Sequence, residues 1–451
     1  MIPLMLIVAT AIPLFYIIVF QLDISGLWKF LLVFVEMAGV SQLLIKRYKV
    51  PSELGLVLVK SKKGIEMIDS LAKHGRIFNF MADAGVVLSY GLLSLKLMRK
   101  NVSAPTFVVG IVALAILSLF VAPVALGFLL YVAGIGAASK SGGVVSGGLE
   151  YGLFIGGLLL LGGLFLLILF GIVFYGLVIF QAILGTLLEG TNALANTSPG
   201  GDILLPGVNL PFIEGIIALG IVLIVHEGAH AILTRIAKIK LLSSGIVLFG
   251  IIPIGAFIEP DEERLMKVEK VKQTRVLVAG PTGNMVAAIG LFALFLVFFM
   301  GTSSFREGAL LITSGLPQGT MVYEIAGQHV EDIDFSSFSL PPGEDITLTT
   351  NKGDMHLMTN ESGKMGIQFY ILDKDSFFTR YGDPVLQFIH TVLGLAIALN
   401  FIVGTVNILP IPLFDGYRIV DVNVRNKTIV KALSYTALAF FILNFVPRLF
   451  Q

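Results

Sequence analysis

The run GIIALGIVLIVHEGAHAILTRIA, residues 215–237, joins an apolar stretch long enough to cross a bilayer to two histidines and a glutamate in its second half. Two of them, His226 and His230, are four residues apart, so a helix places both imidazoles on one face, where they can bind one metal ion. Glu227 lies about 100° further round the helix, beside the open coordination position. Such groups are costly in a membrane helix unless they face a metal or a wet cavity. The run therefore predicts a metal site within a membrane-spanning helix.

The H-E-x-x-H spacing also indicates a reaction. With 6 histidines and 30 acidic residues in 451, chance alone would produce about 0.005 such matches. Zinc lowers the pKa of a bound water, and a neighbouring carboxylate can take its proton, so Glu227 is the candidate general base for hydrolysis. The chain has no cysteine, so histidines and carboxylates must hold any metal.

The composition is that of a polytopic α-helical membrane protein, because 56% of the residues are hydrophobic, 14% are charged and the mean hydropathy is +0.90. A formal net charge of +1 gives no electrostatic reason to expect a nucleic-acid partner. We expect about eight to ten transmembrane segments, since two runs exceed one span and can each be a broken helix, a hairpin or a tilted helix. The apolar runs fall at residues 2–22, 27–45, 78–97, 106–138, 152–188, 213–234, 278–300, 385–412 and 429–447.

The distribution of charge predicts the orientation in a cell membrane. Lysine and arginine cluster at residues 46–76, 235–240, 264–275 and 425–431, and the positive-inside rule assigns these clusters to the cytoplasm. Residues 301–384 are instead rich in aspartate and glutamate. We therefore expect the metal site toward the cytoplasmic side and this segment on the opposite side.

Residues 301–384 are expected to form a β-rich soluble domain. Alternating runs such as MVYEIAG (321–327) and ITLTT (346–350) are separated by Pro-Gly, Asn-Lys-Gly and Ser-Gly turn signals. The stretch SGLPQGTMVYEIAGQHVEDIDFSSF resembles bacterial-type PDZ domains. The alternative is a β-rich extramembrane domain of another kind.

Two further motifs interrupt apolar runs. In NILPIPLFDG, residues 407–416, two prolines break the helix, and Asp415 is the nearby carboxylate. Non-helical backbone at membrane depth usually lines a cavity, so Asp415 is a candidate third ligand, although a surface residue after a helix end is the alternative. In GPTGN, residues 280–284, Asn284 is a polar group in an apolar run, which most often bonds one helix to another.

On these motifs the sequence resembles the site-2 protease family of intramembrane zinc metalloproteases. HEGAH, GPTGN and NILPIPLFDG match the family's H-E-x-x-H, G-P-x-x-N and N-x-x-P-x-P-x-x-D-G, in the family's order, with the PDZ-like insert between the second and third. The resemblance implies that Asp415 is the third zinc ligand and that Asn284 and Asn407 help to position the substrate backbone or the tetrahedral oxyanion. Residues 245–263 also resemble the family's membrane-dipping β-hairpin, whose edge could hold a substrate as an added strand.

The resemblance divides the chain into four parts and leaves the first without a role. Glu36 and Asp83 lie in or near apolar runs of that part, and without ligand spacing we interpret them as structural or interfacial. The four parts are N-terminal transmembrane helices (1–200), a first metalloprotease segment (210–300), the PDZ-like domain (301–384) and a second metalloprotease segment (385–451).

The predicted function is cleavage of membrane-protein substrates within the lipid bilayer by a zinc metalloendopeptidase. The alternative is a transporter or a protease-like protein that binds a cation or a client without cutting it. Glu227 favours the enzyme, because a transporter needs ligands but no base beside an open metal position. The oligomeric state stays open.

Overall fold

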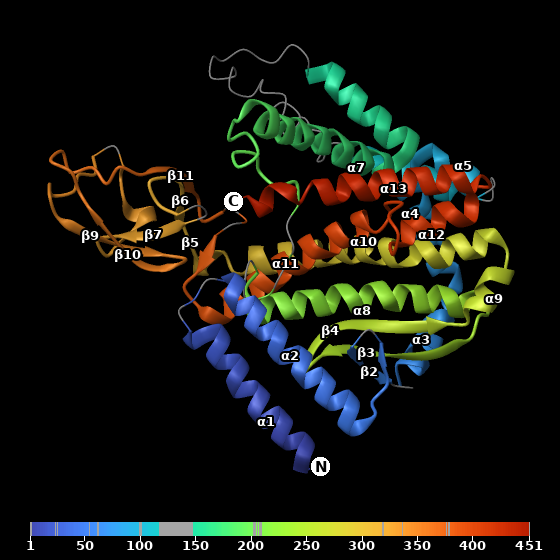
Figure 1. The fold of residues 1–451 in the computed structure, drawn as a ribbon. Helices are drawn as coiled ribbons and strands as arrows, with labels where there is room; N and C mark the ends of the chain where they lie inside the picture. Colours follow the sequence, from blue (N-terminus) through green and yellow to red (C-terminus); the bar gives the residue numbers. More distant parts are fainter. Residues whose placement is uncertain are drawn as a thin grey trace. The chain divides into compact units, whose positions relative to one another are not determined.

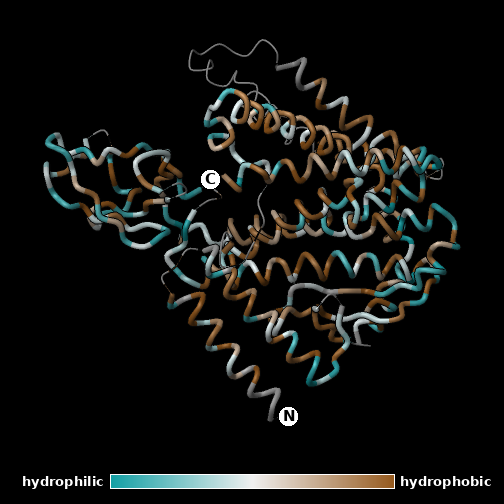
Figure 2. The backbone as a smooth tube through the Cα atoms, viewed as in Figure 1, coloured by the Kyte–Doolittle hydropathy of each residue, from teal (hydrophilic) through white to brown (hydrophobic). Residues whose placement is uncertain are grey.

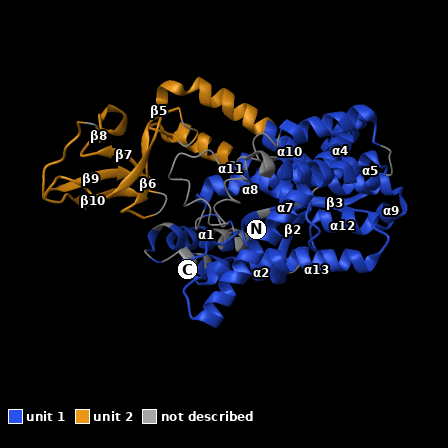
Figure 3. Cartoon of the chain, turned by 90° about the horizontal axis from the view of Figure 1, so that it is seen from above, with its two compact units in different colours: residues 1–289, 395–451 blue, residues 290–394 orange. Residues whose placement is uncertain are grey.

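The computed structural model of the chain consists of two compact units, residues 1–289 with 395–451 and residues 290–394 (Figure 3). The second unit contains the acidic segment 301–384. The residues that the structure describes are 2–22, 24, 26–53, 55–60, 63–98, 102–116, 148–201, 204, 206, 210–317, 320–335, 337–375, 377 and 379–450.

Most of the first unit is helical (Figure 1), and its helices are predominantly hydrophobic along their length (Figure 2). Among the described residues, six helical segments are long and apolar enough to cross a membrane, so the chain is a multi-pass membrane protein. The helices are α1 (Ile2–Tyr16), α2 (Gly26–Tyr48), α3 (Lys63–Ala72), α4 (Gly75–Tyr90), α5 (Ser94–Leu97), α7 (Gly148–Glu189), α8 (Phe212–Ile236), α9 (Glu262–Lys267), α10 (Lys270–Gly301), α11 (Pro384–Val406), α12 (Asp415–Asn423) and α13 (Lys427–Leu443).

The predicted spans can be compared with these helices one by one. The six long segments correspond to the runs that begin at residues 78, 152, 213, 278, 385 and 429. The first run and the start of the fourth contain shorter apolar helices, Ala9–Val19 and Ala104–Ile116, and the second run forms α2. Residues 117–147, which hold the rest of the fourth run with Pro123, lie outside the described part. The run at 152–188 forms a broken helix, α7, whose two helical parts meet at Gly163, where the backbone is not helical (φ 61°, ψ −157°).

A four-stranded antiparallel sheet lies beside α8. Its strands are β1 (Ser52–Glu53), β2 (Leu56–Lys60), β3 (Leu241–Phe249) and β4 (Ile252–Pro260), in the order β1-β2-β3-β4. The predicted hairpin at 245–263 is therefore confirmed as a hairpin of β3 and β4. The N-terminal part of the chain extends it, because β2 pairs with β3 from Val57↔Leu248 to Lys60↔Gly245. The strand β4 is then the end strand, and it runs along α8 (Figure 1).

The core of the first unit joins α4, α8 and α10. Buried side chains from these three helices, among them Val86, Ala231 and Val278, belong to one hydrophobic cluster. The burial of such side chains contributes about 1.5–3 kcal/mol each for residues as large as valine or leucine. This packing holds α8 and α10 side by side, which places the HEGAH and GPTGN motifs next to each other.

The second unit has a β-sheet with the order β10-β9-β7-β6-β11, and β8 pairs with β7. Alternate residues of the strands, such as Leu310, Val322 and Leu348, form its buried core. The β-rich character predicted for 301–384 is confirmed, and its likeness to a PDZ domain stays a prediction. The strands are β5 (Arg306–Glu307), β6 (Ala309–Ser314), β7 (Met321–Ile325), β8 (Gln328–His329), β9 (Asp345–Thr350), β10 (Gly353–Met358), β11 (Gln368–Leu372) and β12 (Arg380–Tyr381).

Candidate metal centre

The helix α8 supplies two imidazoles from one face. His226 and His230 are one turn apart, and their ring Nε2 atoms are 3.3 Å from each other. The ring of His230 is oriented by α10, because its Nδ1–H donates to the carbonyl oxygen of Val276 over 2.7 Å. A neutral imidazole that donates from Nδ1 has its lone pair on Nε2. This hydrogen bond therefore aims the Nε2 lone pair of His230 at the space that it shares with His226.

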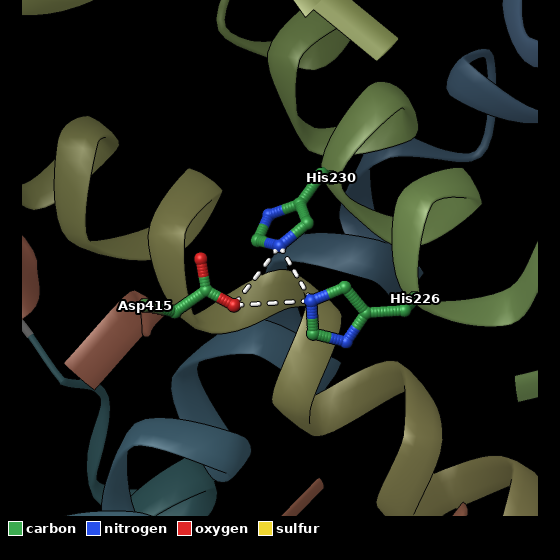
Figure 4. Close-up of side chains that lie close together, drawn as sticks. All are labelled: His226, His230 and Asp415. Carbon is green, nitrogen blue, oxygen red and sulfur yellow. Dashed lines mark hydrogen bonds and ion pairs between the residues drawn. The ribbon is translucent and has the colours of Figure 1, made fainter. Parts of the chain in front are cut away.

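The broken helix at NILPIPLFDG brings a carboxylate to the same place. Helix α11 ends at Val406, before the two prolines, and α12 begins at Asp415. The intervening turn is closed by the backbone N–H of Gly416, which donates to the carbonyl of Asn407 over 2.7 Å. As a result, Oδ2 of Asp415 lies 3.1 Å from Nε2 of His226 and 3.2 Å from Nε2 of His230 (Figure 4).

These three atoms fit a tetrahedral metal ion. Ligands about 2.0–2.1 Å from a tetrahedrally coordinated zinc are separated from one another by about 3.3–3.4 Å, and the observed separations are 3.1–3.3 Å. Because His230 donates from Nδ1, Nε2 of its neutral ring presents a lone pair to the carboxylate oxygen of Asp415. Two lone pairs repel each other, so a cation or an added proton is required between these atoms. Two imidazoles, one carboxylate and an open fourth position are the donor set of a catalytic zinc.

A cavity of about 220 Å³ surrounds these ligands. Glu227, half-buried on α8 and next to His226 in the sequence, also lines it, so a carboxylate that does not belong to the ligand group borders the same cavity. The cavity is also lined by Ile258 and Pro260 of β4. The arrangement can hold a water, a base and an extended peptide at one place, which are the requirements for hydrolysis.

The two predicted substrate-binding asparagines lie in different surroundings. Asn407 lines the cavity with the metal-binding group. Asn284 is fully buried in α10 and is not among the cavity-lining residues. Its side chain packs beside Gly404 of α11, and neither polar atom of its amide has a hydrogen-bond partner among the described residues. The structure therefore brings Asn407, but not Asn284, to the site.

Two features of the site escaped sequence reasoning. Gly280, the first residue of GPTGN, lies directly against the ligands: a Cβ at this position would be 2.4 Å from Nε2 of His230 and 2.6 Å from Nε2 of His226. Leu413 lines the cavity, is fully exposed and has a φ of 82°, a left-handed conformation that costs about 1–3 kcal/mol for such a residue. The GPTGN motif is the signal that could have drawn attention to Gly280, whereas no local pattern marks Leu413.

Replacing Gly280 by alanine is expected to weaken metal binding by at least about 10-fold, because the added methyl group must displace both imidazoles. Equilibrium competition with a fluorescent zinc chelator measures this change. The matched control is Gly290→Ala in the same helix, where a Cβ would meet nothing within 4 Å. Equal affinities for the two variants would contradict the close approach of α10 to the ligands.

In the described part of the chain, six helical segments of membrane-spanning length occur together with a His-His-Asp group and a neighbouring glutamate, a combination typical of intramembrane metalloproteases. The family model of Peptidase family M50 matches residues 214–445, just over half of the chain. The chain belongs to this family, which comprises the site-2 proteases. The match begins near the start of α8 and ends after α13, so it includes the elements that build the metal centre.

A relative in Methanocaldococcus jannaschii, described as an uncharacterized protein, is 28% identical over 244 residues. The similarity extends over 52% of this chain and 62% of that protein. The chain thus covers less than two thirds of the relative's length, and the relative's name assigns no activity.

Proposed function

We propose that the chain is a zinc endopeptidase that hydrolyses peptide bonds in transmembrane or membrane-proximal segments of membrane proteins. Such a reaction releases membrane-tethered proteins, as in regulated intramembrane proteolysis. The observation that carries the proposal is the convergence of His226, His230 and Asp415 within 3.1–3.3 Å, with Glu227 lining the same cavity. The substrate-binding role of Asn407 belongs to this proposal, whereas Asn284, which is buried away from the cavity, would act only by positioning α10 on α11.

In the proposed mechanism, the residues of the chain bind the peptide and move one proton. Zinc held by the three ligands would lower the pKa of a bound water to about 7. Glu227 takes the proton of this water through its carboxylate and later donates it to the leaving amine. Asn407, on the cavity wall, directs its side-chain N–H toward the oxygen that becomes negative in the tetrahedral intermediate. Glu227 thus acts on the attacking water and on the leaving nitrogen, and Asn407 acts on the carbonyl oxygen.

The substrate is proposed to bind as an added strand along β4. A transmembrane helix must unwind before one of its amides can reach the metal, and a sheet edge offers backbone partners to the unwound segment. Strand β4 pairs on one side with β3, and among the described residues no strand pairs with its other side. Because Ile258 and Pro260 of β4 line the cavity, a peptide on this edge would run past Glu227.

The alternative of a cation transporter or a protease-like binding protein explains less of the site. Transport or client binding does not require a carboxylate that lies next to the metal ligands without being one of them. Glu227 therefore favours hydrolysis.

The proposed orientation places the metal centre toward the cytoplasm. The ligands lie in the second half of α8, which ends at Ile236 within the basic cluster Arg235–Lys240. Positive clusters of this kind remain on the cytoplasmic side. The acidic segment 301–384 is proposed to lie on the other side.

This segment is proposed to restrict access to the protease. Its two ends meet, because Thr302 Oγ1 and the Tyr381 hydroxyl are 2.8 Å apart and β5 pairs with β12. Residues 303–380 can therefore be replaced by a short flexible linker. We expect the shortened protein to keep its zinc affinity and to cut a membrane substrate with a bulky extramembrane head more readily than the full chain does. For each protein, the cleavage rate of the substrate with the head is divided by the rate of the substrate without it. If this ratio is the same for the full chain and the shortened protein, the segment does not restrict access.

The activity is tested with purified protein in liposomes together with single-span membrane proteins as substrates. Mass spectrometry of the products should find cleavage within or next to the apolar segment, a chelator should stop the reaction, and zinc should restore it. Intact substrates under zinc-replete conditions, across a set of varied transmembrane segments, would count against an endopeptidase.

A further inference from the structure

Helix α4 precedes the family match and contacts both sides of the metal centre. Its first contact is a two-pronged ion pair: Nε and Nη2 of Arg275 on α10 donate to the two carboxylate oxygens of Asp83 over 2.6 and 2.7 Å. The Asp83 side chain is 9% exposed. Arg275 is the residue before Val276, whose carbonyl oxygen orients His230. The pair therefore fixes the turn of α10 that carries this carbonyl.

The second contact is the packing of the Thr282 side chain of α10 against the backbone of α4 at Gly85. A Cβ at Gly85 of α4 would be 1.9 Å from Oγ1 of Thr282 in the GPTGN motif. Two residues earlier in the same motif, Gly280 touches the two metal-binding imidazoles. One stretch of α10 is thus held between α4 and the imidazoles. A shift of α4 toward α10 or away from it would change the distance between Gly280 and the rings.

The third contact reaches the loop that supplies the carboxylate. The hydroxyl of Tyr90, at the end of α4, donates to the carbonyl oxygen of Ile408 over 3.3 Å. Tyr90 is 2% exposed and Ile408 is fully buried. Ile408 follows Asn407, whose carbonyl closes the turn before Asp415. Tyr90 therefore supports the non-helical segment whose conformation determines the position of the Asp415 carboxylate.

We propose that α4 is a positioning element of the metal centre, with Asp83 setting the orientation of His230 through α10 and Tyr90 setting the place of Asp415 through the Ile408 loop. This inference rests on the proposed function, in which His230 and Asp415 hold zinc. It gives a role to part of the N-terminal region that the protease motifs leave out.

The physical reason is that ligand geometry depends on supporting contacts. Removal of a group that orients a metal ligand typically costs about 10–100-fold in metal affinity or activity. Here the supporting hydrogen bond comes from a backbone carbonyl, which no side-chain substitution removes. The side chains that hold that carbonyl in place are therefore the residues through which the geometry can be tested.

The test compares Asp83→Asn and Tyr90→Phe with two matched controls in the full-length protein. Asp69→Asn breaks the Asp69–Arg235 pair, which also ties the N-terminal region to the metalloprotease segment but does so at α8 and not at α10. Tyr175→Phe removes a hydroxyl that donates to the carbonyl of Ser198 over 2.6 Å, in a buried tyrosine of α7. Zinc affinity is measured by chelator competition, and the visible spectrum of the cobalt-substituted protein reports on ligand geometry.

We expect a zinc dissociation constant raised about 10-fold or more in Asp83→Asn and by a smaller factor, about 3-fold or more, in Tyr90→Phe. Both should have altered cobalt spectra, and both controls should match the wild type. Wild-type affinity and spectrum in the folded variants would overturn the inference while leaving the proposed function intact. If Asp83→Asn fails to fold, Tyr90→Phe decides alone, because it removes a single oxygen. A wild-type protein that binds no zinc would overturn the inference together with the proposed function.

Discussion

Replacing Glu227 by glutamine is expected to abolish peptide hydrolysis while zinc remains bound. A glutamine side chain has nearly the same shape as glutamate, but its amide can neither take a proton from water nor return one to the leaving amine. Loss of general-base catalysis lowers the rate by about 10²–10⁴-fold. Because Glu227 is not among the three converging ligand atoms, the metal content should stay at the wild-type level.

The measurement pairs turnover of a membrane substrate in liposomes with zinc content by mass spectrometry of the metal. Glu214→Gln is the matched control, since Glu214 belongs to the first turn of the same helix, about three turns before the metal ligands. Normal turnover with a full complement of zinc in Glu227→Gln would remove Glu227 as the base.

The second large effect is expected at Asp415. Replacing it by asparagine removes the anionic ligand that lies 3.1 and 3.2 Å from the two imidazole nitrogens and leaves a neutral amide in its place. Zinc affinity should fall by more than about 100-fold, beyond the loss that follows removal of a supporting group. Hydrolysis should fall with it and recover in part at high zinc concentration.

Asp421→Asn provides the comparison for Asp415→Asn. Asp421 belongs to the same short helix, α12, and its carboxylate pairs with Lys427 at the surface. If both variants keep wild-type zinc affinity, Asp415 is not a ligand, and the surface position that the sequence also allowed would be the better description of its role.

Much of the site could be predicted because its parts follow local rules. The i, i+4 spacing of His226 and His230 fixes a common face on any helix, and the prolines of NILPIPLFDG end a helix wherever they occur. The convergence of Asp415 with the histidines was reached through the family resemblance, since 185 residues separate it from His230. The β-hairpin beside α8 was likewise predicted from the family resemblance.

The contacts that hold the metal ligands in place could not be predicted, because they do not follow local rules. Every residue has a backbone carbonyl, so nothing in the sequence distinguishes Val276 as the partner of His230. Asp83 was interpreted as structural or interfacial, and its partner Arg275 is 192 residues away. Such pairs depend on how distant segments pack, which local spacing does not determine.

The pairing of β2 with β3 is another result of tertiary structure. The run LVLVK, residues 56–60, is short and lies between basic stretches, and its sequence does not reveal which strand it joins. In the structure it occupies one side of the hairpin. In the proposed binding mode, a substrate strand that pairs with the hairpin would therefore pair with β4, the side that borders the cavity.

The central claim is most directly tested by anomalous scattering at the zinc absorption edge from crystals of the full-length protein. We expect one zinc peak within about 2.0–2.2 Å of Nε2 of His226, Nε2 of His230 and a carboxylate oxygen of Asp415. A zinc peak bound by other residues, or density for these three side chains that points away from a common centre, would contradict it.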